Sequence, residues 1–402
     1  MRILYLTSRF PWPPDRGDRL TVVNMLRALS ARHRVTLLSF VDGHEPPDAM
    51  AQVSPHCERV VTVPLSRARS WLQAWLGVGS TLPSQVSFYG SRRMTGVAHR
   101  LLREGRFDAV ISHAIRMAPY LPDLAPPPVT ILFQGDSVGL VLGGSIPYAR
   151  WWRRPGIAWE RWRVDRFTAA ATRRSSETWV LSPIDLEDMR RIGGVRLEYV
   201  PHGVDERLFA LERAPHPEVR LMFLGNLGVP HNVDAAVFAA REIWPQVRPA
   251  WPSGRLLLVG ADPSPAVRRL AALDGVEVTG RVPDLLPLWR SAHVLVAPLR
   301  FSTGIQNKLL EAMAAGVPVV TTPQAAEAIG ARHGEHLLVA DTADTLAAAV
   351  RQTVADPQAA SARAARARDH VAQHFSWDLA VRRLERLVER GEGESSETEG
   401  PA

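Results

Sequence analysis

The stretch that decides the fold reads Ala297-Pro-Leu-Arg-Phe-Ser-Thr-Gly-Ile-Gln-Asn-Lys-Leu-Leu-Glu-Ala-Met-Ala-Ala-Gly316. It continues from the apolar run 294–297, which is typical of a buried strand, through a loop and into a helical pattern. Thr303, followed three residues later by Gln306, matches a capping box and predicts that the helix begins at Thr303. The segment is therefore predicted to be a strand–loop–helix unit of a parallel α/β sheet.

Gly304, Lys308 and Glu311 have the spacing i, i+4, i+7 and should share one face of this helix. Free N–H groups and the positive helix end suit a phosphate beside Gly304. Lys308, the one lysine among 48 basic residues, adds a cation one turn deeper. Glu311 is placed to accept hydrogen bonds from vicinal hydroxyls such as those of a ribose. The pattern favours a nucleotide diphosphate at the helix start, and its alternative is a capped helix with a solvated Lys308–Glu311 pair.

Short apolar runs alternate with helical patterns along all 402 residues, which predicts two similar βα domains. Parallel-sheet domains that face one another create a cleft at the carboxyl ends of their strands. The stiff segment Ala214-Pro-His-Pro217 marks the boundary. We expect a first Rossmann-like domain over 1–205, a linker over 206–218, a second Rossmann-like domain over 219–375, a C-terminal helix over 376–390 and a disordered acidic tail over 391–402.

The net charge is +7, and residues 1–200 hold 27 Arg against 17 acidic residues, which suggests an anionic partner for the first half. One cysteine excludes an intrachain disulfide, and no apolar run is long enough for a spanning helix. Arg and Trp alternate over 148–166, and Trp71 and Trp75 follow two arginines. This mixture suits a membrane interface, a helix with a buried Trp face, or nucleic acid; no recognisable nucleic-acid motif is present.

The segment 309–320, Leu-Leu-Glu-Ala-Met-Ala-Ala-Gly-Val-Pro-Val-Val, resembles the donor-binding signature of retaining glycosyltransferases of family 4. Further segments resemble the same family in order and spacing: 200–209, 223–235, 278–284 and 375–378. The segment 11–19 and the first strand look most like a branch associated with bacterial exopolysaccharide and exosortase gene systems.

The resemblance implies the GT-B fold, α/β with two facing Rossmann-like domains and a last helix that crosses back to the first domain. It implies a donor site in the second domain, an acceptor site in the first, substrate-side retention and no metal. The chain departs from the family where Thr303 replaces the first of two glutamates, Glu311 matching the second. The usual basic phosphate ligands are also missing, and Lys308 or Arg300 is expected to supply their charge.

His113 and Asp136 follow predicted strands of the first domain, where a polar group can hydrogen-bond the sugar or the attacking hydroxyl. The alternative is a packed strand-end histidine and a turn aspartate. The predicted catalytic residues are Asp136, His113 and Lys308. The predicted donor-binding residues are Gly17, Gly225, Asn226, Arg281, Val282, Thr303, Gly304, Ile305, Lys308 and Glu311.

The sequence thus predicts a cytoplasmic retaining glycosyltransferase at the inner membrane face, with an anionic membrane surface as partner and no nucleic acid. It would move a sugar from a nucleotide diphosphate sugar to a lipid-linked or polysaccharide acceptor in exopolysaccharide or cell-envelope glycan synthesis, without a cofactor. The alternatives are a sugar-nucleotide epimerase on a GT-B-like fold and a non-catalytic nucleotide-binding partner subunit.

Overall fold

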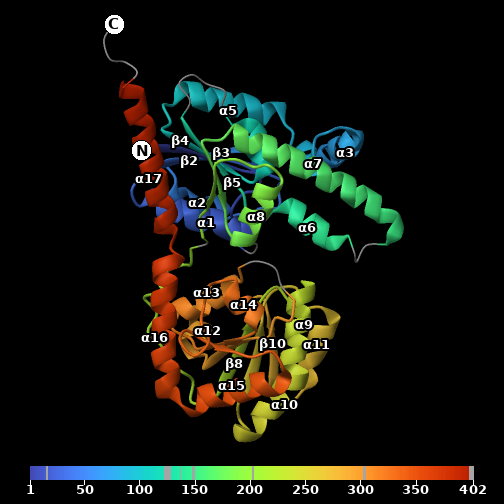
Figure 1. Ribbon diagram of the computed structural model, residues 1–402, viewed down its shortest axis with the longest axis vertical. Helices are drawn as coiled ribbons and strands as arrows, with labels where there is room; N and C mark the ends of the chain where they lie inside the picture. Colours follow the sequence, from blue (N-terminus) through green and yellow to red (C-terminus); the bar gives the residue numbers. More distant parts are fainter. Residues whose placement is uncertain are drawn as a thin grey trace. The chain divides into compact units, whose positions relative to one another are not determined.

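The computed structural model describes residues 1–14, 17–121, 128–135, 137–146, 150–201, 203–301 and 305–397. The chain forms two compact units, Met1–Pro201 with Trp377–Ala402 (unit 1) and His202–Ser376 (unit 2) (Figure 1). Each unit is built on one parallel sheet with helices packed against it. The predicted α/β fold with two parallel sheets is confirmed.

The sheet of unit 1 has the strand order β3-β2-β1-β4-β5-β6-β7, and all its pairs are parallel. The central strand β1 is an apolar run buried on both faces, as expected for a strand covered by helices on either side. The order reverses between β1 and β4, which creates a crevice at their carboxyl ends. The strands are β1 (Arg2–Thr7), β2 (Arg34–Val41), β3 (Arg59–Pro64), β4 (Ala109–His113), β5 (Val129–Phe133), β6 (Glu177–Val180) and β7 (Leu197–Tyr199).

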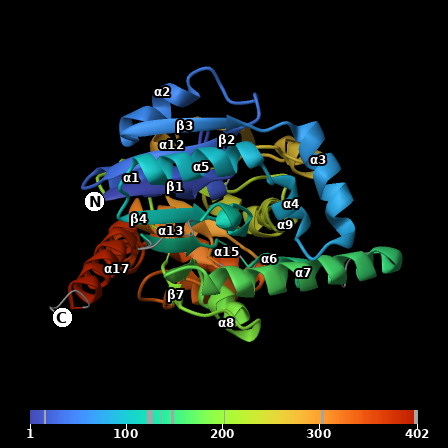
Figure 2. The same ribbon diagram turned by 90° about the horizontal axis from the view of Figure 1, so that it is seen from above.

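Alternate residues of β1 pack into two different cores, because successive side chains of a strand point to opposite faces. Ile3 and Tyr5 pack with helices α1 and α17, whereas Leu4 and Leu6 pack with α5. Figure 2 shows α3 and α7 reaching beyond the sheet at one side of unit 1. The helices of unit 1 are α1 (Gly17–Ser30), α2 (Ala49–Val53), α3 (Arg67–Leu76), α4 (Ser84–Phe88), α5 (Arg92–Glu104), α6 (Val138–Ser145), α7 (Arg154–Arg173), α8 (Pro183–Arg191) and α17 (Trp377–Glu397). Short 3₁₀ turns include η2 (Gly77–Gly79), η3 (Ile115–Tyr120) and η4 (Trp151–Arg153).

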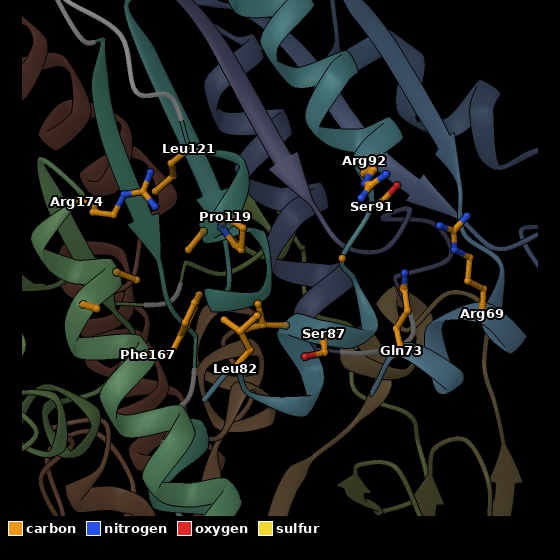
Figure 3. Close-up of a pocket in the computed structure, with 15 residues that line it drawn as sticks. Arg69, Gln73, Leu82, Ser87, Ser91, Arg92, Pro119, Leu121, Phe167 and Arg174 are labelled. Atoms are coloured by element: carbon orange, nitrogen blue, oxygen red, sulfur yellow. The ribbon is translucent and has the colours of Figure 1, made fainter. Parts of the chain in front are cut away.

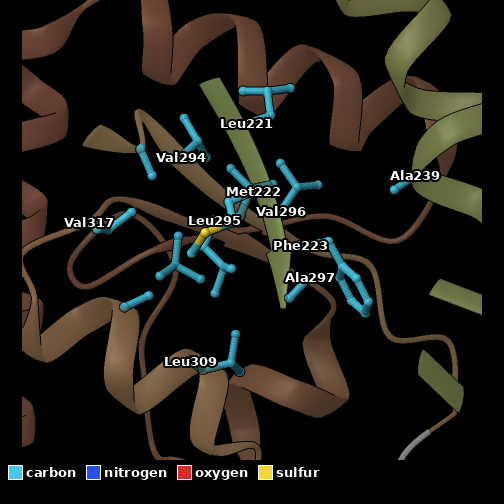
Figure 4. Packing of buried hydrophobic residues seen from close by; sticks show 14 of the residues in the cluster. Leu221, Met222, Phe223, Ala239, Val294, Leu295, Val296, Ala297, Leu309 and Val317 are labelled. Atoms are coloured by element: carbon cyan, nitrogen blue, oxygen red, sulfur yellow. The ribbon is translucent and has the colours of Figure 1, made fainter. Parts of the chain in front are cut away.

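The sheet of unit 2 has the order β10-β9-β8-β11-β12-β13 and is again parallel, with its reversal between β8 and β11. Its core joins β8 and β11 to α13 through Phe223, Leu295 and Leu309 (Figure 4). The strands are β8 (Arg220–Leu224), β9 (Arg255–Val259), β10 (Val276–Gly280), β11 (Val294–Ala297), β12 (Val319–Thr321) and β13 (Leu338–Val339). The helices are α9 (Pro230–Phe238), α10 (Trp244–Val247), α11 (Pro265–Arg268), α12 (Leu286–Ser291), α13 (Asn307–Ala314), α14 (Pro323–Glu327), α15 (Ala343–Ala355) and α16 (Pro357–His374).

The predicted start of the key helix is wrong. Helix α13 begins at Asn307, and Gln306 occupies the N-cap position with an extended backbone (φ −100°, ψ 101°). Gln306 therefore precedes the helix instead of lying in its first turn. Thr303 and Gly304 lie outside the described residues.

Two segment boundaries also differ from the prediction. The segment 206–218 packs against unit 2 and is not a free linker, since Arg213 Nη1 donates to the carbonyl of Gly316 (2.9 Å) and the amide of Ala214 to that of Arg290 (3.0 Å). The last helix is described as far as Glu397, whereas the predicted helix ends at 390. In the described part of the chain, every helix is too short or too polar to cross a membrane.

Candidate functional site

The turn after β8 is fixed against the turn after β9. The amide of Gly225 donates to the carbonyl of Val259 (3.0 Å), and Asn226 Nδ2 donates to Asp262 Oδ2 (3.0 Å). Gly260 has a φ of +149°, and a Cβ there would lie 1.7 Å from the carbonyl oxygen of Gly225. Only glycine fits this close approach, which sets the shape of the strand ends.

Lys308 projects from α13 toward this turn and is only 7% exposed. Its Nζ donates to Asn232 Oδ1 on α9 at 2.5 Å and lies 5.1 Å from the ring centroid of Phe223. Asn232 Nδ2 in turn donates to the carbonyl of Asn226 (3.1 Å). Burial lowers the pKa of Lys308 to about 8, although the charge of Glu311 opposes the shift. Lys308 is therefore a buried cation at the strand-order reversal and not half of a solvated surface pair.

Glu311 lies one turn further along α13 and is half-buried. Among the described residues its carboxylate makes no hydrogen bond and no ion pair within 4.0 Å. Burial raises the pKa of Glu311 to about 7, the charge of Asp205 raises it further, and Lys308 opposes both. A partly desolvated carboxyl group without a partner is a typical feature of a ligand site.

Three further predicted donor-binding residues, and Arg300, lie in different surroundings. Arg281 and Val282 follow the edge strand β10, where Arg281 is exposed and Val282 packs partly into the core. Ile305 also packs against the core of unit 2. Arg300, the other expected source of charge, instead pairs with Asp234 and lies 4.6 Å from the ring centroid of Phe238.

Unit 1 carries a cluster of charged residues at its own strand-order reversal. Asp18 Oδ2 accepts from Arg9 Nη1 (2.7 Å) and Arg116 Nη2 (3.3 Å). Arg116 Nε donates to Ser8 Oγ (2.5 Å), and Arg9 Nε donates to the hydroxyl of Tyr89 (3.2 Å). Burial alone would raise the pKa of Asp18, but the two guanidinium groups hold it below its ordinary value. We call Arg9, Asp18 and Arg116 the arginine–aspartate cluster.

His113 lies at the end of β4, next to this cluster. It is buried, its Nδ1 is 3.1 Å from the hydroxyl of Tyr5, and its ring packs 5.2 Å from that of Phe133. Gly17 is the first residue of α1, and no described atom lies within 4 Å of where its Cβ would be. Asp136 lies outside the described residues.

A cavity of about 780 Å³ adjoins the cluster. Its lining includes Arg9 and Arg116 together with the aromatic residues Trp71, Phe88 and Tyr89. We call this cavity the strand-end pocket. The arginine–aspartate cluster was not predicted from the sequence. The available signal was that Arg9 follows β1 and Arg116 follows β4, two neighbouring strands.

The tryptophans of the Arg/Trp segment are exposed. Trp151 is 80% exposed and Trp152 53%, whereas Trp159 and Trp162 are 41% and 44% exposed, so the four side chains do not form a fully buried Trp face. Trp159 and Trp162 stack on each other at 4.9 Å between ring centroids. Tyr148 lies outside the described residues.

Comparison with known proteins extends this geometry. Residues 218–356, which include Asn232, Lys308 and Glu311, match the family model Glycosyl transferases group 1. A phosphatidyl-myo-inositol mannosyltransferase of Mycolicibacterium smegmatis is 30% identical over 215 residues, 51% of this chain and 54% of that protein. The chain thus spans about half the length of this curated relative.

Two solved structures match almost the whole chain. Sucrose-phosphate synthase from Thermosynechococcus elongatus superposes with a TM-score of 0.65 at 17% identity, over 99% of each chain. Anabaena HepE in complex with UDP-glucose superposes with a TM-score of 0.64 at 15% identity, over 98% of this chain and 100% of that one. Residues 218–356 therefore match the Glycosyl transferases group 1 model, in a chain whose two parallel sheets have the fold of GT-B glycosyltransferases.

Proposed function

We propose that the protein is a retaining glycosyltransferase that moves a sugar from a nucleotide diphosphate sugar to a lipid-linked or polysaccharide acceptor. One observation carries the proposal: the buried Lys308 ammonium lies at the strand-order reversal of unit 2, one helical turn from the Glu311 carboxylate, which has no partner among the described residues. Both residues lie within the segment that matches the glycosyltransferase family. The match supports glycosyl transfer over epimerisation.

In this proposal Glu311 accepts hydrogen bonds from the ribose hydroxyls, and Lys308 binds the diphosphate. An ammonium has three N–H donors, and Asn232 accepts from one of them. The leaving diphosphate gains negative charge in the transition state, and a preorganised cation in a desolvated site stabilises that charge strongly. Lys308 therefore contributes to donor affinity and more strongly to turnover, whereas Glu311 acts on donor affinity.

The acceptor is assigned to unit 1. Asp18 is ionised at neutral pH because its two arginine partners lower its pKa, so it can accept a hydrogen bond from a sugar or acceptor hydroxyl. In the reaction the bond from the sugar's anomeric carbon to the diphosphate oxygen breaks. A bond to the acceptor oxygen forms on the same face, and the hydroxyl proton passes to the departing diphosphate.

A lipid-linked acceptor and a membrane location are part of the proposal. The mycobacterial relative is named for mannosyl transfer to phosphatidyl-myo-inositol, a lipid. The exposed tryptophans of η4 and α7 lie among arginines, a combination that suits an anionic bilayer surface. We propose peripheral association with the inner face of the cytoplasmic membrane, in the synthesis of an exopolysaccharide or cell-envelope glycan.

The decisive experiment is a thermal-shift panel of nucleotide diphosphates and nucleotide sugars, followed by product analysis with the best ligand. A ligand at 100 times its Kd should stabilise the protein by about 2.7 kcal/mol. The anomeric configuration of a glycosylated acceptor, read by NMR, distinguishes retention from inversion. An epimerised nucleotide sugar would replace the proposal by an epimerase, and binding without turnover would replace it by a partner subunit.

A further inference from the structure

Unit 1 contains a second cavity, of about 820 Å³, between α3, α4, α7 and η3 (Figure 3). We call it the helical pocket. It shares no lining residue with the strand-end pocket, because opposite sides of α3 and α4 face the two cavities. On α3, for example, Trp71 and Ala74 face the strand-end pocket, while Arg69 and Gln73 face the helical pocket. The helical pocket is therefore a separate site, and its volume is in the range of about 300–1,000 Å³ of ligand-binding cavities.

The middle of the helical pocket is apolar. Leu82 and Val86 line it from the side of α4, Phe167 from α7, and Pro119 and Leu121 from η3 and the residue that follows it (Figure 3). Such walls bind hydrocarbon by removing it from water.

The rim of the same pocket is cationic. Arg174 stands at one end, and Arg69 and Arg92 stand at the other (Figure 3). Each is exposed, and none forms an ion pair or side-chain hydrogen bond with the described residues. Among the described residues no Asp or Glu lines the pocket, so its arginines have no acidic counterpart there. Charge complementarity then requires an anionic ligand.

The outer face of α3, beside the pocket, is apolar and exposed. Leu72, Trp75 and Leu76 on α3, with Trp75 72% exposed, continue into Val78 and Leu82 of the following turn. An exposed apolar helix face with arginines beside it is typical of an element that lies in the headgroup region of a bilayer.

This outer face is held firmly to α7. The Arg163 guanidinium is buried, and its Nη1 lies 2.9 Å from the carbonyls of Gly77 and Leu82 and 3.3 Å from that of Ser80. Glu160 pairs with Arg163 and accepts from the amide of Ser84 (2.7 Å). The apolar face and the pocket are thus parts of one structured element.

We propose that the helical pocket binds one anionic phospholipid, drawn from the membrane on which α3 lies, with its acyl chain between Leu82 and Phe167 and its phosphate at Arg69 and Arg92, which share one end of the pocket (Figure 3). A free anion would not need the apolar walls, and an uncharged lipid would not need the uncompensated arginines. The inference goes beyond the proposed glycosyl transfer and does not depend on it, since the pocket lies in unit 1 and the donor residues Lys308 and Glu311 lie in unit 2.

The test uses the full chain and soluble dihexanoyl phosphatidic acid below its micelle concentration, with titration calorimetry as the readout. We expect saturable binding of one molecule per chain. Arg69→Gln/Arg92→Gln should weaken it about tenfold or more, because charge-assisted hydrogen bonds to phosphate are lost. Ala170→Trp, which fills the pocket from an exposed position of α7, should abolish it.

Matched controls remove the same charge or add the same bulk elsewhere. Arg93→Gln/Arg106→Gln changes two exposed arginines outside the pocket, and Ala158→Trp places an indole at an exposed position of α7 outside it. Both control variants should bind the probe like the parent. Two control ligands, glycerol phosphate and dihexanoyl phosphatidylcholine, should each bind the parent at least about tenfold more weakly than the probe does.

Three results would overturn the proposal: no saturable binding, Ala170→Trp binding like the parent, or equal losses in the control variants. Equal affinity for glycerol phosphate would reduce the site to an anion site without a lipid. Nucleotide sugar affinity of the pocket variants, measured in parallel, should stay unchanged. If the parent chain binds the lipid but no nucleotide sugar, that result would count against the proposed transferase alone.

Discussion

Asn232 accepts a hydrogen bond from the ammonium of Lys308 at 2.5 Å, and this bond joins the helices that follow β8 and β11 in unit 2. The two residues are 76 positions apart, yet their contact lies where the strand order of the sheet reverses. It places the one lysine of the chain at the point where open α/β sheets bind ligands.

Lys308→Met should lower turnover by about 10²–10³, the effect of losing one electrostatic stabiliser of the leaving group. Steady-state rates with the best donor, on protein whose unfolding transition is intact, provide the measurement. Lys308→Arg should recover part of the rate at most, because a planar guanidinium differs from a point charge. Arg300→Met is the control, since Arg300 already pairs with Asp234. A larger loss from Arg300→Met would assign the phosphate contact to Arg300 instead.

Glu311→Gln should weaken donor binding by about 1.5–3 kcal/mol, because the neutral amide loses a charge-assisted hydrogen bond to the ribose. Calorimetry with the nucleotide diphosphate measures the loss. Glu327→Gln, an exposed glutamate on α14, is the matched control and should bind normally. Equal affinities of the two variants would remove Glu311 from the donor site.

Donor affinity should have a bell-shaped dependence on pH. The pKa of Glu311 is raised to about 7, so its carboxylate is protonated and accepts poorly as the pH falls below that value. The pKa of Lys308 is lowered to about 8, so its positive charge is lost as the pH rises above that value. Affinity for a nucleotide sugar, whose diphosphate stays ionised throughout, should peak between the two. Glu311→Gln should flatten the acidic limb and Lys308→Met the alkaline limb; unchanged limbs would assign the titration to other groups.

Gly260→Ala should destabilise unit 2 by more than Gly280→Ala. A methyl group at Gly260 meets the carbonyl of Gly225 at 1.7 Å, whereas one at Gly280 meets no described atom within 4 Å. Both positions have positive φ, so each substitution costs about 1 kcal/mol in backbone strain, and the overlap at Gly260 adds to it. Chemical denaturation of both variants compares them, and equal losses would show that the two turns can separate.

Trp151→Ala/Trp152→Ala should reduce sedimentation with anionic vesicles, and binding of the parent should fall as salt rises, because the attraction is screened. Leu273→Ala, at an exposed apolar position of unit 2, is the control. Vesicle binding that changes neither with salt nor on substitution of the tryptophans would show that these residues do not form the membrane contact.

The strands and the key turn of the site could be predicted from sequence because their signals are local. Apolar runs such as Arg2–Thr7 are short and continuous, and Lys308 and Glu311 lie one turn apart whatever the exact start of the helix. That start could not be predicted. The capping pattern of Thr303 and Gln306 is present in the sequence, but Gln306 is extended and the helix begins after it.

Contacts between distant segments could not be predicted from the sequence. Arg116 reaches Asp18 across 98 positions, and the pairing depends on β1 and β4 being neighbours in the sheet. The exposure of the tryptophans could not be predicted either, because helical spacing shows which residues share a face but not what covers that face. Arg163 illustrates this: within an apparently solvated run of arginines, it is buried and bound to backbone carbonyls of another segment.

The scarcity of lysine gives the Lys308 site a chemical consequence. Amine-directed reagents can react with only two amino groups of this chain, the N-terminal amino group and that of Lys308. With a pKa of about 8, Lys308 holds far more free amine near neutrality than an ordinary lysine. A ligand seated against the ammonium shields it from a small acylating reagent, so the extent of labelling at Lys308, counted separately from that of the N-terminal amino group, measures occupancy of the site without any assay of sugar transfer.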